Sequence, residues 1–192
     1  MGLDVRVGVD NHEQVFERRH ENGDELTSLQ QHSLSRTFCW LMCRRDAIEE
    51  EPELDQVGRI TGVDIAPLYA MEQYTTEFAA SESAEYADSE VERQRIFDQA
   101  RASRERLAGN IELVLKTVLA LLDSLARIDD LPSRLYRHPN DRLNPSVYFS
   151  DFELDKGDGY IGNNFGQDLR NLRTILLYAK SRGTKTVYFA YD

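Results

Sequence analysis

The residues whose types could support chemistry lie mostly in one segment, which combines carboxylates, glycines, amides and a guanidinium. Its candidate ligand-binding residues are Asp151, Glu153, Asp155, Asp158, Gly159, Asn163, Asn164, Asp168 and Arg170. If residues 147–153 form a strand, Asp151 and Glu153 lie on the same side of it and could share a proton or a metal ion. Hydrolysis that uses this pair, or one of the two with Asp168, is therefore one hypothesis, although the spacing indicates no particular reaction.

The glycines of this segment suggest two further kinds of ligand site. Residues 157–162 read Gly-Asp-Gly-Tyr-Ile-Gly, which matches the G-x-G-x-x-G pattern that holds a phosphate with backbone amides and a helix N-terminus. The charge of Asp158 and the lack of an acidic residue about 20 positions further on argue against a dinucleotide. Residues 155–162 also resemble the middle of a calcium-binding loop, but Leu154, Lys156 and Phe165 stand where oxygen ligands are needed. The sequence therefore predicts no cofactor and no metal ion.

The same segment also has a purely structural interpretation. The glycines would form a turn, Asn163 or Asn164 would cap the following helix, and Asp168 would favour the positive start of that helix. Outside the segment, Cys39 and Cys43 are predicted to be buried free thiols on one helix face. The chain has no P-loop, no nucleophile elbow and no HExxH zinc motif. Catalysis is therefore not favoured, and a small-molecule or nucleotide-phosphate site, or a carboxylate-dependent hydrolase, is the alternative function.

Three strands and several helices are expected to position these residues. Alternating or branched and aromatic residues predict strands near both termini and before the last helix, at 2–9, 184–192 and 147–153. Helical periodicity and helix-end signals predict helices at about 26–48, 54–60, 67–74, 89–129 and 164–182. The predicted fold class is α+β, with a small, about three-stranded sheet packed by a long central helix and shorter helices. Residues 1–192 are expected to form a single domain.

The long helix has a clear start and one weak point. Ser89 and Glu92 fit a capping box, which predicts a helix from there to Asp129. At Gly109-Asn110 the helix could be broken, but a continuous helix with a bend is slightly favoured. The preceding residues, 75–88, are rich in Ala, Ser and Glu and predict a mobile acidic loop. The long helix is apolar enough to offer a second face to another copy of the chain, so a homodimer is one prediction and a fully buried helix is the alternative.

The charge distribution suggests the class of partner. The net charge is −11, and residues 1–130 alone carry 14 Lys and Arg against 27 Asp and Glu. Such a surface argues against non-specific nucleic-acid binding and favours a basic protein partner. No segment is apolar enough to cross a membrane, and no secretory signal is recognised, which predicts a cytoplasmic protein. The favoured function is thus a non-catalytic binding or regulatory protein of the inhibitor, immunity or accessory type.

Overall fold

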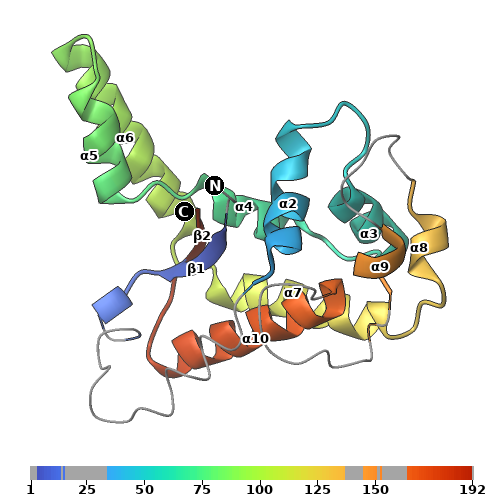
Figure 1. The fold of residues 1–192 in the computed structure, drawn as a ribbon. Coiled ribbons are helices and arrows are strands. Elements are labelled where there is room, and N and C mark those ends of the chain that lie inside the picture. The colour runs from blue at the N-terminus through green and yellow to red at the C-terminus, as the bar shows by residue number, and fades with distance from the viewer. Residues whose placement is uncertain are drawn as a thin grey trace.

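The fold was obtained as a computed structural model, and the structure describes residues 4–13, 15, 34–136, 145–150, 152 and 164–191. Most of these residues are helical, and two strands pair beside the helices (Figure 1). The strands and α-helices are β1 (Val5–Val9), α2 (Arg36–Cys43), α3 (Glu53–Thr61), α4 (Ala66–Ala70), α5 (Glu77–Glu85), α6 (Glu90–Leu107), α7 (Ile111–Leu125), α8 (Leu131–Arg134), α9 (Pro145–Tyr148), α10 (Phe165–Ser181) and β2 (Val187–Tyr191). Two short 3-10 helices, η2 (Arg44–Asp46) and η3 (Met71–Gln73), follow α2 and α4. The predicted α+β class is confirmed at this level.

The sheet joins the two ends of the described chain. Strands β1 and β2 run antiparallel, with Val7 opposite Phe189 and Gly8 opposite Tyr188. The valines of β1 alternate with polar or small residues, which places Val7 on the buried face that the sequence pattern predicts. Phe189 meets the ring of Phe38 on α2 edge to face, with ring centroids 5.8 Å apart. The two terminal strands are therefore confirmed, and they anchor the sheet to α2.

The third predicted strand is wrong within the described residues. Residues 145–148 form the short helix α9, which begins at Pro145, and the chain turns after Tyr148. Tyr148 and Phe149 are adjacent in sequence, yet both are buried against Phe165, with centroid distances of 5.9 and 5.3 Å. A strand would point two neighbouring side chains to opposite faces, whereas a helical turn followed by a bend can bury both. Aromatic content indicated a strand here, but packing around Phe165 decides the conformation.

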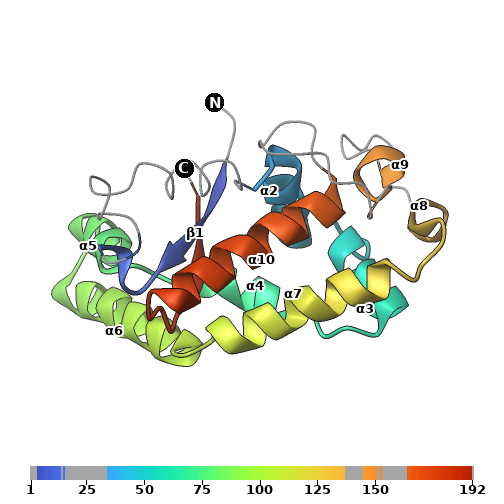
Figure 2. The ribbon, with the colours of Figure 1, turned by 90° about the horizontal axis from the view of Figure 1, so that it is seen from below.

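Helices α7 and α10 form the centre of the body, where they pack side by side (Figure 2). Both helices have broad apolar faces; the side chains that α7 buries include Val114, Val118 and Leu121, and those of α10 include Leu169, Leu172 and Leu176. Within the part of the chain that the structure describes, no helix has the length and apolar character to span a membrane. The broad apolar face of α7 is accounted for by packing against α4 and α10.

The predicted continuous helix 89–129 is wrong, because the chain breaks at the weak point. Gly109 has a φ of 77°, a left-handed conformation that ends α6 and that side-chain-bearing residues rarely adopt. Asn110 does not cap α7 through its side chain. Its amide instead donates to the carbonyl of Val187 and accepts from the Val187 N–H, both at 2.8 Å. The chain between α6 and α7 is thus held to β2 by these two hydrogen bonds. Helix α6 leaves the body in a different direction from α7.

Helices α5 and α6 pack against each other as a helical hairpin that projects from the body, and we call residues 76–107 the arm (Figure 1). The predicted loop at 75–88 is therefore wrong in its secondary structure, since α5 occupies most of it. Thr76 caps α5 by accepting from the Ala79 N–H at 3.1 Å. The capping box is confirmed in part: the Ser89 hydroxyl accepts from Glu92 N–H at 3.2 Å, while Glu92 reaches back to the N–H of Asp88. Local caps therefore define where each of the two helices of the arm begins.

Candidate functional site

The structure describes three of the residues predicted to bind a ligand: Asn164, Asp168 and Arg170. Asn164 is the N-cap of α10, and its Oδ1 accepts from the Gln167 N–H at 2.7 Å. Arg170 donates to the carbonyl of Phe152 at 2.5 Å and to the side-chain oxygen of Gln167 at 3.0 Å. The other candidates, Asp151, Glu153, Asp155, Asp158, Gly159 and Asn163, lie outside the described residues.

Asp168 lies in the interior and connects three elements. Its carboxylate accepts hydrogen bonds from the Ser35 N–H at 2.8 Å, from the Ser35 hydroxyl at 2.6 Å and from the Tyr148 hydroxyl at 2.8 Å. Ser35 is also the N-cap of α2, because its hydroxyl accepts from the Phe38 N–H. Burial raises the pKa of Asp168 from 3.8 to about 6, against the opposing effect of these donors. Burial, with Asp168 beside it, also raises the pKa of Tyr148.

These contacts give the described part of the segment a structural role. Asn164 begins α10, Asp168 ties α10 to α2 and α9, and Arg170 holds the backbone at Phe152. Asp168 is fully buried, so its carboxylate does not face solvent where a ligand could reach it. A ligand site that uses the carboxylates and glycines of residues 151–163 stays a prediction.

The arm exposes large apolar side chains that the fold of the described residues does not bury. Three of its apolar residues are largely exposed: Phe78 at 73%, Tyr86 at 85% and Val91 at 82%. The seam between α5 and α6 is small, and the described residues that it buries are mainly Ala80, Ala84 and Ala100. Helices in folded proteins are stabilised chiefly by burying an apolar face, and this seam offers little apolar area. Phe78, Tyr86 and Val91 therefore face outward, whereas Leu107 at the base of the arm is buried.

The outer face of α5 combines aromatic and acidic side chains. Phe78, Glu82 and Glu85 are spaced four and three residues apart, which places them on one face, opposite Ala80 and Ala84. Residues 76–92 contain six Asp or Glu and no Lys or Arg. Exposed aromatic side chains within a charged surface are typical of binding interfaces. We call residues 76–92 the acidic half of the arm.

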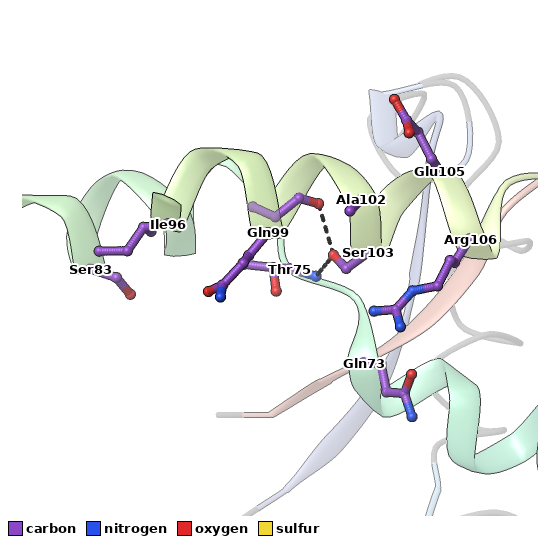
Figure 3. A pocket seen from close by; sticks show the side chains of 10 residues that line it. Gln73, Thr75, Ser83, Ile96, Gln99, Ala102, Ser103, Glu105 and Arg106 are labelled. Atoms are coloured by element: carbon purple, nitrogen blue, oxygen red, sulfur yellow. Dashed lines mark hydrogen bonds between the residues drawn. The ribbon is translucent and has the colours of Figure 1, made fainter. Parts of the chain in front are cut away.

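The base of the arm is held to the body by contacts with Thr75. The Ser103 hydroxyl accepts from the Thr75 N–H at 3.1 Å and donates to the Ala100 carbonyl, as Figure 3 shows. Arg104 donates to the Thr75 carbonyl at 3.2 Å and lies 3.7 Å from Glu77. Ser103 is buried, so these contacts close the base of the arm, where the chain enters α5 and leaves α6. The arm is thus presented in a defined orientation.

A groove of about 960 Å³ lies beside this base (Figure 3). Most of the residues that line it are of polar type, with Gln73, Gln99, Ser103 and Arg106 among them. Among the described residues that line the groove, Glu105 is the one carboxylate, and there is no His, Cys or Lys.

Sequence reasoning missed the arm as an element, although two signals for it were present. The absence of bases from residues 76–92 marked the acidic half, and Gly109 marked the end of α6. The apolar stripe of the predicted long helix concealed the difference between α6 and α7, because Phe97 was expected inside and lies at the surface. Comparison of the chain with known protein families, with curated proteins and with solved structures gives no match.

Proposed function

We propose that this protein is a non-catalytic binding protein that docks on a basic protein partner through the acidic half of the arm. The observation that supports this most is the projecting helix α5, whose outer face carries Phe78, Glu82 and Glu85 and whose inner face buries only small residues. An aromatic anchor surrounded by carboxylates suits a partner with an apolar pocket rimmed by Lys or Arg. The carboxylates steer such a partner, and Phe78 supplies apolar area when water is excluded.

The proposal explains why the arm lacks a core of its own. A helical pair that buries mainly alanines gains little from internal packing, whereas a docked partner would cover Phe78 and Tyr86. The fixed base at Ser103 and Arg104 lowers the cost of binding, because the arm need not be ordered by the partner. An inhibitor, immunity or accessory protein needs such a preformed docking element.

The first prediction concerns the charge of α5. The double variant Glu82→Lys with Glu85→Lys is expected to lower the affinity for the partner at least about tenfold, because it replaces two attractive contacts with repulsive ones. Affinity capture from a cell lysate, with the retained proteins quantified by mass spectrometry, measures this loss. Wild-type capture should also fall steeply as the salt concentration rises from about 50 to about 500 mM.

A matched control separates the arm from the total charge. The double variant Glu49→Lys with Asp129→Lys changes the net charge by the same amount at exposed positions outside the arm. It is expected to retain the partner, and circular dichroism should show that both double variants keep their helices. Equal losses in the two double variants, or capture that salt does not weaken, would contradict the proposal.

A further inference from the structure

The outward face of α6 forms a second surface of different character. It contains a shallow groove lined by Val91, Gln94, Arg95, Asp98 and Ala102, which recur with helical spacing. The residues that α6 buries, Ala100, Ser103 and Leu107, lie on the opposite side of the helix. This face therefore points away from α5. We call it the outward face of α6.

In the first half of α6, contact with α5 leaves no side chain fully buried. Every residue of α6 before Ala100 is exposed or half-buried, and Val91 is among the most exposed apolar residues of the described chain. The helix is supported there by its cap at Ser89 and by side-chain ion pairs within one turn, such as Arg95–Glu92 at 3.4 Å and Arg101–Asp98. Exposed ion pairs of this kind contribute little to stability. Replacing these ion pairs by contacts with another helix would therefore cost little free energy.

The charge pattern of α6 is complementary to itself when two copies run antiparallel. Such a pair, crossing midway between Ile96 and Phe97, brings Arg95 of each copy opposite Asp98 of the other. The same alignment places the apolar Val91 opposite Ala102. Because the arrangement is two-fold symmetric, each of these pairs occurs twice.

No like charges oppose each other between residues 90 and 103 in this alignment. The like-charged pair nearest the centre, Asp88 with Glu105, falls at the rim, where solvent and salt screen it most. A partner of unrelated sequence would have no reason to reproduce this pattern, whereas a second copy of the chain supplies it automatically.

We propose that the outward face of α6 is a homodimer interface, in which two arms pack antiparallel through two Arg95–Asp98 pairs with Val91 and Ala102 as apolar contacts. This interface is separate from the acidic outer face of α5, so a dimer could still dock a basic partner on each arm. The inference does not depend on the proposed function, because its contacts come from α6, whereas the proposed docking face carries Phe78, Glu82 and Glu85 of α5.

Charge exchange across the two-fold axis tests the interface directly. Sedimentation equilibrium of the full chain, at protein concentrations up to about 100 µM, should show a monomer–dimer equilibrium in the wild type. The single variants R95D and D98R are each expected to weaken dimerisation at least about tenfold, because each creates two repulsive pairs. The double variant R95D/D98R restores both pairs in reversed order and should return the dimer constant to within about threefold of wild type.

The double variant restores the contact between copies, and it also restores opposite charges at residues 95 and 98 within one helix. Within one α6, R95D brings a carboxylate near Glu92 and D98R brings a guanidinium near Arg101. Circular dichroism of the single and double variants therefore accompanies the dimer measurement, and recovery of the dimer at unchanged helix content must come from contacts between copies. V91D, which removes the apolar contact, should also weaken the dimer, while E82K on α5 should leave it unchanged. A wild-type chain that stays monomeric, a dimer that survives V91D, or a double variant that fails to recover overturns this interface.

Discussion

Asp168→Ala is expected to lower the free energy of unfolding by about 3 kcal/mol at about pH 5, because it leaves three buried donors without their acceptor. Those donors are the N–H and hydroxyl of Ser35 and the hydroxyl of Tyr148. Ser35 and Tyr148 are both buried, so water cannot easily replace the carboxyl oxygens. The loss also loosens the contact of α10 with α2 and α9. Urea denaturation followed by circular dichroism measures the effect.

The contribution of Asp168 should also depend on pH in a specific direction. Its pKa is about 6 in the folded protein, above the ordinary value of 3.8, so the folded state holds the proton more tightly than the unfolded chain. The stabilisation that results is fully present below about pH 4 and is lost as the pH rises through about 6. Asp168→Asn, which cannot titrate in this range, should remove this part of the pH dependence. Relative to that variant, the wild type should lose about 2–3 kcal/mol between about pH 4 and pH 7.

A contrary result would change the interpretation of this cluster. If wild type and Asp168→Asn show the same pH dependence, the carboxyl does not titrate with a raised pKa. If Asp168→Ala is as stable as wild type, the three hydrogen bonds do not hold α10 in place. Either finding would reopen the possibility that Asp168 serves a ligand instead of the fold.

Gly8→Val is expected to destabilise the protein by about 2–3 kcal/mol, because a side chain at this position has no room. A Cβ atom on Gly8 would lie 2.2 Å from the Tyr188 ring on the opposing strand. Tyr188 cannot simply turn aside without loss, since its ring stacks on Tyr74 with centroids 4.0 Å apart and an angle of 9° between planes. Thermal or urea unfolding compared with wild type measures the loss.

A double-mutant cycle identifies the cause of this effect. In a Tyr188→Ala background the ring is gone, so Gly8→Val should cost much less than in the wild type, and the branched side chain should suit the strand. An equally large cost in both backgrounds would show that Gly8 is needed for another reason, such as its backbone conformation. The outcome therefore distinguishes contact between the two strands from local strain.

Local signals predicted much of the fold because they act within one turn. Ser89 and Asn164 cap α6 and α10, Gly62 ends α3 in a left-handed conformation, and Pro67 lies in the first turn of α4. The alternation at the N-terminus predicted β1, and its buried valines follow the period of a strand. The physics of these features needs only neighbouring residues, so a single sequence carries it.

Features that depend on distant residues were not predictable in this way. The side-chain amide of Asn110 bonds to the backbone of Val187, which is 77 positions away, and no local sequence pattern predicts that contact. Tyr148 and Phe149 have strand propensity, but Phe165 buries both on a helical turn. Asp168 suits a helix start by charge, yet its main partners lie on α2 and α9. The arm was hidden for a similar reason, because amphipathic periodicity continues through α6 although the body does not cover it.

The most direct test of the central claim is site-specific photo-crosslinking from the arm. A photoreactive phenylalanine analogue placed at position 78, on the exposed face of α5, should crosslink to a basic protein in a lysate at low salt and lose that product at high salt. The same analogue at position 177 on α10, an exposed apolar position of the body, is the control. Salt-sensitive crosslinks from position 78 alone are the result that docking through the arm predicts. The same product from position 177, or none from position 78, would contradict it.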